Sequence, residues 1–238
     1  MRRIDDRPRH AQIAADLRAR ILCGDLTGTL PPFKQLMEQY DTSTNTAQRA
    51  VALLKAEGFV EGQKGKALII RSDRIKIIDA TAQLVPAISS ITYQILHAGH
   101  ERPPADAASK LGLGDGGKAL LRKRLTLQDG DPIEIEWSYY PDSIVTGTSP
   151  ANPQRVDSDF PKLLAELGWR QHEFVDEVQV REPTTEELQT LELPDEVPVM
   201  RTLRTVTDKD GVVLEVTIMV KAGHLYGMRY RQTLPPVS

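Results

Sequence analysis

The sequence lacks the residues and segments on which several classes of protein depend. Cys23 is its single cysteine, which excludes an internal disulfide and any multi-cysteine zinc site. No apolar run approaches the roughly 18 residues that a membrane-spanning helix needs. The N-terminus is basic, but it is not followed by the apolar segment of a secretory signal. These absences predict a cytoplasmic protein that has no membrane partner.

Motifs for catalysis and for binding metals or cofactors are also missing. The sequence has no GxSxG, no P-loop and no glycine pattern of a dinucleotide-binding fold. His97 and His100 favour a surface pair over a metal site. The glycine-rich segment 112–117 follows a predicted helix and precedes a predicted strand, the wrong order for cradling a phosphate. We therefore expect no enzyme, no cofactor and no metal.

Charge is distributed unevenly along the 238 residues. Of 30 basic and 33 acidic residues, segment 1–75 holds 13 and 9, a net charge of +4, and the remainder holds 17 and 24, a net charge of −7. A basic front part on an acidic chain is compatible with a DNA-binding domain joined to a domain of another kind. The length allows two modest domains, each with its own core.

Residues 30–66 contain the most informative pattern. Apolar residues recur at helical spacing within 32–40 and again within 44–57, and a third helix is predicted before them at 9–23. Ser43 stands where a helix N-cap is expected. Strand-like residues then flank the basic turn Gly62–Lys66. Two helices joined by a tight turn are typical of proteins that place the second helix in the DNA major groove.

The second part of the chain contains an internal repeat. Segment 111–136 resembles segment 191–215: each reads as the end of a helix, a strand that carries arginine, an Asp-Gly turn and a strand that carries glutamate. Asp-Gly between alternating apolar runs is a strong hairpin signal. Two such units predict one mainly antiparallel sheet with helices against it. Between them, 159–167 is predicted to be helical and 173–181 to be an edge strand.

On these motifs the chain resembles the GntR-type transcription regulators of the HutC subfamily. The segments LPPFKQLMEQY, STNTAQRAVALLKAEGFV and GQKGK follow the order of their winged helix-turn-helix, and residues from about 88 to 232 resemble their UTRA effector-binding domain. The resemblance implies an α+β protein with a winged helix-turn-helix at 1–71, a linker at 72–87 and a UTRA, chorismate-lyase-like domain at 88–238. It also implies a homodimer on a double-stranded DNA operator.

The resemblance assigns the DNA-binding residues. The start of the recognition helix reads base edges, since Asn and Gln pair with adenine and Arg pairs with guanine. Base contacts are predicted for Thr44, Asn45, Thr46, Gln48 and Arg49. Phosphate contacts are predicted for Lys34 and Ser43, and wing contacts for Lys64, Gly65 and Lys66. Thr44 and Gln48 replace arginines that are usual in the family, so we expect an altered operator. The alternative is an exposed polar helix face beside a basic loop.

The resemblance also assigns an effector site. Its predicted residues are Arg124, Glu136, Tyr139, Glu215 and Lys221. Arg124 suits a carboxylate or phosphate, because its planar fork binds such groups through two hydrogen bonds. The alternative is that these charges form cross-strand ion pairs on a solvated face.

Three functions are compatible with the sequence. The first is a ligand-responsive transcription regulator, in particular a repressor that binds a palindromic operator as a dimer. The second is an effector-independent regulator of a plasmid or mobile element, in which the second domain only dimerises. The third is a chorismate-lyase-like enzyme, against which the helix-turn-helix argues.

Overall fold

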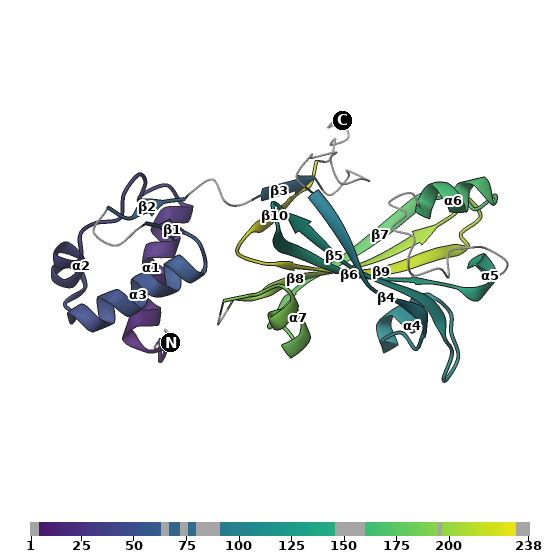
Figure 1. Ribbon diagram of the computed structural model, residues 1–238, viewed down its shortest axis with the longest axis horizontal. Coiled ribbons are helices and arrows are strands. Elements are labelled where there is room, and N and C mark those ends of the chain that lie inside the picture. The colour runs from purple at the N-terminus through teal and green to yellow at the C-terminus, as the bar shows by residue number, and fades with distance from the viewer. Residues whose placement is uncertain are drawn as a thin grey trace, which may run out of the picture. The chain divides into compact units, whose positions relative to one another are not determined.

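The computed structural model forms two compact units (Figure 1). One comprises Met1–Ile78 with Gly227–Arg229, and the other comprises Asp79–Tyr226 with Tyr230–Ser238. The structure describes residues 5–62, 67–71, 76–79, 91–145, 160–194 and 197–231. Each unit has its own hydrophobic core. No helix in the described part of the chain is long and apolar enough to cross a membrane.

The first unit is a three-helix bundle with a short hairpin. Its elements are α1 (Arg9–Leu22), α2 (Phe33–Tyr40), α3 (Thr44–Ala56), β1 (Val60–Glu61) and β2 (Ile69–Ile70). The helices agree with the predicted segments to within one residue at each end, and the hairpin strands are shorter than predicted. Leu17, Leu36 and Leu54, one from each helix, are almost completely buried and hold the bundle together.

The second unit is built on a six-stranded antiparallel sheet. Its elements are β4 (Ile91–Glu101), α4 (Ala105–Lys110), β5 (Ala119–Gln128), β6 (Asp131–Tyr140), α5 (Asp142–Val145), α6 (Phe160–Glu166), β7 (Glu173–Arg181), α7 (Thr185–Thr190), β8 (Val199–Thr207) and β9 (Val213–Ala222). The strands lie in the order β4-β5-β6-β9-β8-β7, so β7 is an edge strand as predicted. A separate pair joins β3 (Lys76–Asp79) to β10 (Tyr226–Arg229). The α+β prediction is confirmed.

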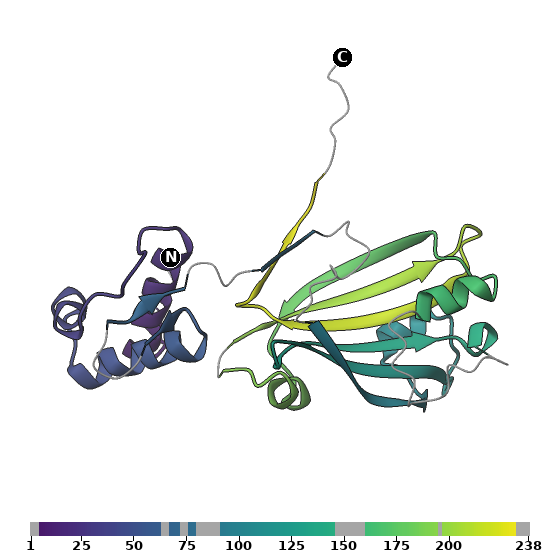
Figure 2. The ribbon, with the colours of Figure 1, turned by 45° about the horizontal axis from the view of Figure 1, so that its top comes forward.

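The two faces of this sheet have different roles. Helices α4 and α7 lie against one face (Figure 1), and the unit's main core fills the space between them and the sheet. Among the described elements, helices α5 and α6 cover one end of the opposite face, where Leu120, Tyr140 and Leu164 form a smaller cluster (Figure 2). The rest of that opposite face carries mainly polar side chains, together with a few apolar ones such as Met219.

The predicted repeat corresponds to two equivalent units, α4-β5-β6 and α7-β8-β9. Asp129 and Gly130 both have positive φ, as a tight Asp-Gly turn requires, whereas in the second hairpin Gly211 does and Asp208 supports a longer turn through its side chain. The structure extends the repeat to the strands β4 and β7, which the sequence comparison did not include. Neither strand contains a turn motif by which it could have been matched.

Candidate DNA-binding surface and effector site

The start of α3 is fixed by two local features. The Ser43 hydroxyl accepts a hydrogen bond from the backbone N–H of Thr46 at 3.3 Å, which satisfies one of the helix's unpaired donors. Asp41 ends α2 in the left-handed conformation, with φ of 44°. Aspartate tolerates this conformation better than most residues, so the turn forms without the glycine that is usual there.

The side chains at this helix end divide into free and engaged groups. Asn45, Gln48 and Arg49 are exposed and form no hydrogen bond or ion pair with other described residues. By contrast, the Thr44 hydroxyl donates to Met37 Sδ at 3.3 Å. The Thr46 hydroxyl lies 3.0 Å from Ser43 Oγ and is partly covered. Asn45, Gln48 and Arg49 are therefore the side chains available to reach base edges.

Of the other residues predicted to contact DNA, the structure describes Lys34 but not the residues of the wing. Lys34 is exposed in the first turn of α2, where a flexible ammonium can reach a phosphate. Lys64, Gly65 and Lys66 lie outside the described residues, so their predicted role at the wing stays a prediction.

An ion pair that the sequence did not reveal anchors the far end of α3. Arg18 on α1 donates two hydrogen bonds, from Nε and Nη2, to the Glu57 carboxylate, and Glu57 is only 5% exposed. A buried carboxylate is stable only when it is paired. The contact therefore sets the position of α3 against α1.

A second network holds α2 to α1. The Tyr40 hydroxyl donates to Asp16 Oδ2 at 2.5 Å, and Arg9 donates to the Tyr40 carbonyl at 2.7 Å. Burial, together with the hydrogen bond to Asp16, raises the pKa of Tyr40 to about 12. Tyr40 thus stays a neutral donor at the end of α2.

Removal of the α3 cap should weaken the first unit measurably. We expect Ser43→Ala to lower the free energy of unfolding by about 1 kcal/mol, because the Thr46 N–H loses its acceptor. Urea unfolding followed by circular dichroism at 222 nm measures this loss. Ser43→Asp, which restores an acceptor, is the matched control and should unfold like the wild type. Equal losses in both variants would show that the cap contributes little.

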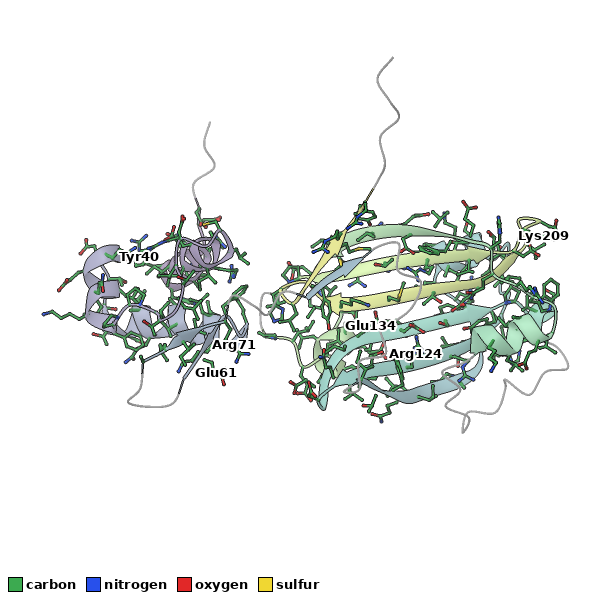
Figure 3. All side chains as sticks on the ribbon, turned by 90° about the horizontal axis from the view of Figure 1, so that it is seen from above. Tyr40, Glu61, Arg71, Arg124, Glu134 and Lys209 are labelled. Atoms are coloured by element: carbon green, nitrogen blue, oxygen red, sulfur yellow. The ribbon has the colours of Figure 1, made fainter. Side chains whose placement is uncertain are left out.

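The polar sheet face contains four of the five predicted effector residues. Registers of the paired strands place on it Arg122, Arg124, Thr126, Glu134, Glu136, Ser138, Tyr140, Asp176, Thr202, Arg204, Glu215, Thr217 and Lys221. Arg124 and Glu134 project from its middle strands (Figure 3). Side chains alternate between the faces of a sheet, so Leu121, Leu125 and Ile135 on β5 and β6 point into the core.

The prediction for Tyr139 does not fit this geometry. Its side chain lies on the opposite face, is 4% exposed and belongs to the main core. Alternation along β6 gives the reason, since Tyr139 stands one residue out of phase with Glu136 and Ser138. Tyr140 is the tyrosine on the polar face.

A chain of hydrogen bonds links the predicted residues across β5, β6 and β9. Arg124 Nη2 donates to Glu136 Oε2 at 2.8 Å, and the Ser138 hydroxyl contacts Glu136 Oε1 at 3.0 Å. Ser138 Oγ also lies 2.9 Å from Thr217 Oγ1, which lies 2.6 Å from Glu215 Oε1. The cross-strand ion pairs expected as the alternative are thus present, and Arg124–Glu136 is one of them.

The surroundings of Glu215 shift the pKa of its carboxyl group. Burial raises the pKa of its carboxyl, with the nearby charge of Glu136 adding to the shift. Hydrogen bonds from the Thr217, Ser138 and Tyr140 hydroxyls act in the opposite direction, because they stabilise the charged carboxylate. Glu215 also accepts from the Tyr140 hydroxyl at 3.0 Å.

A raised pKa makes stability depend on pH in a defined direction. The stabilising contribution of protonated Glu215 is complete below 4.5, the ordinary value for glutamate, and is lost as pH rises through its higher folded pKa. Glu215→Gln carries a neutral amide at every pH. We therefore expect its unfolding free energy, relative to wild type, to improve between pH 4.5 and pH 8. Tryptophan fluorescence measures this, because Trp137 and Trp169 are the only tryptophans and both lie in the second unit. A difference in unfolding free energy between variant and wild type that stays constant from pH 4.5 to pH 8 would contradict a raised pKa for Glu215.

Lys221 meets partners that sequence reasoning did not identify. It forms an ion pair with Glu134 on the neighbouring strand, and its ammonium lies 6.0 Å from the centre of the Tyr226 ring. Burial, and secondarily the charge of Arg124, lowers the pKa of Lys221 to about 7. The contacting Glu134 carboxylate opposes this shift by favouring the charged ammonium. Strand alternation on β6 was the signal that placed Glu134 on this face.

Both units match known families. Residues 9–70 match the bacterial regulatory proteins of the gntR family, and residues 89–226, more than half of the chain, match the UTRA domain. The chain is a GntR-family regulator with a UTRA domain. An HTH-type transcriptional regulator of Streptomyces coelicolor is 28% identical over 96% of this chain and 94% of its own length. Another, from Mycobacterium tuberculosis, is 23% identical over 96% and 86%.

Solved structures show the same fold. The crystal structure of PhnF from Mycobacterium smegmatis superposes with a TM-score of 0.59 at 18% identity, over 94% of this chain and all of that one. The regulator YydK from Bacillus subtilis gives 0.53 at 20% identity, over 95% and 100%. The solved structures support the fold, and the matching family and the curated relatives are those of transcriptional regulators rather than of enzymes.

Proposed function

We propose that this regulator is a ligand-responsive repressor that binds a palindromic operator as a homodimer. Each subunit would place α3 in the major groove of one half-site, and the UTRA domains would pair the subunits. A small molecule bound on the polar sheet face would favour an arrangement in which the two α3 helices no longer match the half-site spacing. Such coupling is typically worth about 1–3 kcal/mol, or roughly 5- to 150-fold in DNA affinity. Its site of action would be the cytoplasm.

The observation that carries the DNA-binding part is the free polar cluster at the start of α3. The side chains of Asn45, Gln48 and Arg49 are exposed and form no hydrogen bond or ion pair with other described residues. Their donors and acceptors are therefore available to DNA. Amide and guanidinium groups of this kind form hydrogen bonds with base edges. Lys34 and Ser43 would bind phosphates. Wing contacts from Lys64, Gly65 and Lys66 complete the proposed interface.

The effector part of the proposal is carried by the buried polar network. Arg124, Glu136, Glu215 and Lys221 all lie on one sheet face, where the structure supplies mixed charge and several hydroxyl groups. Burying charged and polar groups is costly unless they are paired, and Arg124 Nε and Thr126 Oγ1 have no hydrogen-bond partner among the described residues. Arg124 is the best candidate to hold an anionic part of the ligand, and Glu136 and Glu215 to bind its hydroxyl or amino groups.

Selection of genomic fragments by the purified protein tests this function. Fragments bound at low salt are sequenced and then rebound at higher salt. We expect recovery of a small set that shares a palindrome, because base contacts survive salt better than phosphate contacts alone. Diffuse recovery that vanishes with salt would contradict sequence-specific regulation. Specific binding that no small molecule changes would instead favour an effector-independent regulator.

A further inference from the structure

The sheet of the second unit consists of two equivalent halves. Its strand order reads β4-β5-β6 from one edge and β7-β8-β9 from the other, and β6 pairs with β9 at the centre. Arg124 on β5 and Arg204 on β8 occupy matching positions within the repeated sequence. Both project onto the polar face.

Each of these arginines lies over an aromatic ring from the edge strand of its own half. The guanidinium carbon of Arg124 is 4.9 Å from the centre of the Tyr93 ring on β4. That of Arg204 is 4.1 Å from the Phe174 ring on β7. The two sites thus share an arginine and an aromatic ring on the neighbouring edge strand, although β4 has a register shift between Ile95 and His97 that β7 lacks.

They differ at the residue directly opposite the arginine on the edge strand. Arg204 faces Asp176, which accepts from Nε at 2.7 Å and from Nη2 at 2.8 Å. The Asp176 side chain is 8% exposed, so this is a buried two-point ion pair. Arg124 faces Ile95 in the same register, and an isoleucine side chain offers no acceptor.

Arg124 therefore keeps an unsatisfied donor. Glu136 takes its Nη2, but among the described residues Nε has no hydrogen-bond partner. The hydroxyl of Thr126, two residues along the same face, is also unpartnered. The Arg124 side chain nevertheless remains 28% exposed. Arg122 is buried nearby and has interactions of its own. A buried donor without an acceptor destabilises the site, and an anion that enters the site would remove this penalty.

We infer that Asp176 is a built-in anion that fills one of two equivalent arginine sites, so that the effector supplies a single anionic group, a carboxylate or phosphate, to Arg124. This rests on the effector-binding role proposed above and adds that the ligand carries one anionic group, because Asp176 already occupies the second arginine. The group would take the place beside Arg124 that Asp176 takes beside Arg204. Asp176 is then a specificity-determining residue, because it excludes a second anionic group.

The charges on the polar face agree with this assignment. Four basic residues (Arg122, Arg124, Arg204 and Lys221) stand among four acidic ones (Glu134, Glu136, Asp176 and Glu215). A ligand with two anionic ends would bring its second charge toward carboxylates that are already paired or buried. The second anionic group and these carboxylates would repel each other, and the repulsion is strong where water is excluded.

Single substitutions that exchange the two sites test the inference. The full chain is unfolded thermally with tryptophan fluorescence as the signal, in sodium phosphate, sodium acetate or sodium chloride at equal ionic strength. In wild type, phosphate or acetate should raise the midpoint above that in chloride. Phosphate also stabilises proteins without binding a site, so the anion whose effect is reduced in Ile95→Asp identifies the group. Ile95→Asp gives Arg124 its own carboxylate and should weaken the apparent anion affinity roughly tenfold or more. Ile95→Asn has the same shape without the charge and should respond like wild type.

The complementary variant opens the second site. Asp176→Asn frees Arg204, so its midpoint should rise with anion concentration more steeply than that of wild type. Should this variant fold poorly, the Ile95 pair decides alone. Equal anion responses of Ile95→Asp and Ile95→Asn would overturn the inference, as would the absence of any anion effect in wild type.

These measurements contain no DNA, so their outcome is separate from that of the operator experiment. A normal operator with no anion response would leave the regulator in place and remove the ligand class. The expected anion responses without any sequence-specific DNA binding would support the ligand class and contradict the proposed role as a regulator.

Discussion

The double variant Gln48→Ala/Arg49→Ala should lose most of the affinity for the selected operator. Both side chains are exposed at the start of α3 and have no partner among the described residues, so their removal should not disturb the fold. Each good two-point contact to a base contributes about 1–3 kcal/mol of discrimination. Together we expect a loss of about 2–4 kcal/mol, or roughly 30- to 700-fold in Kd. Fluorescence anisotropy with labelled operator measures it.

Lys55→Ala is the matched control, because it removes a positive charge from an exposed position in the last turn of the same helix. It should change operator affinity by less than about threefold, since a single screened charge far from the helix start contributes little. Binding to unrelated DNA should change little in the double variant. A double variant that still binds the operator like wild type would place the reading residues elsewhere.

Arg18→Met should destabilise the first unit by about 2–3 kcal/mol, because it leaves the Glu57 carboxylate buried without a partner. Loss of the contact should also loosen α3, so operator binding should fail at a lower temperature than in wild type. Circular dichroism at 222 nm follows this unit, since α1, α2 and α3 contain most of the described helical residues. Tryptophan fluorescence should remain that of wild type, because both tryptophans lie in the other unit.

The double variant Arg18→Met/Glu57→Met is the control for this pair. Replacing both partners by apolar side chains removes the uncompensated charge, so most of the lost stability should return. A double variant that is as unstable as the single one would mean that packing of the Arg18 stem, rather than the ion pair, holds the two helices.

The sequence predicted the fold because its strongest signals are local. Helical periodicity, the Ser43 cap and the Asp-Gly turn at 129–130 each act over a few residues, and the structure agrees with all three. The repeat then predicted two similar units and the antiparallel sheet. Strand alternation correctly placed Glu134 on the face of Glu136.

The sequence did not reveal contacts between residues on strands that are far apart along the chain. Nothing in a strand of alternating residues states which neighbour it will pair with, so Asp176 opposite Arg204 and Lys221 beside Glu134 became visible only in the structure. The Arg18–Glu57 pair likewise joins residues that only the bundle brings together. Tyr139 was assigned to the effector site from its place in the motif, but its side chain lies in the core. A difference of one residue along a strand moves a side chain to the other face of the sheet.

Operator affinity measured with and without small molecules tests the central proposal, that the sheet face controls DNA binding. Anisotropy of the labelled operator would be followed while wild type and Arg124→Ala are exposed to a panel of small carboxylic acids and phosphorylated metabolites. We expect at least one compound to weaken wild-type binding by roughly 5- to 150-fold. Arg124→Ala should hold the same operator with normal affinity and fail to release it. Release of both proteins by the same compound, or of neither by any, would contradict the account.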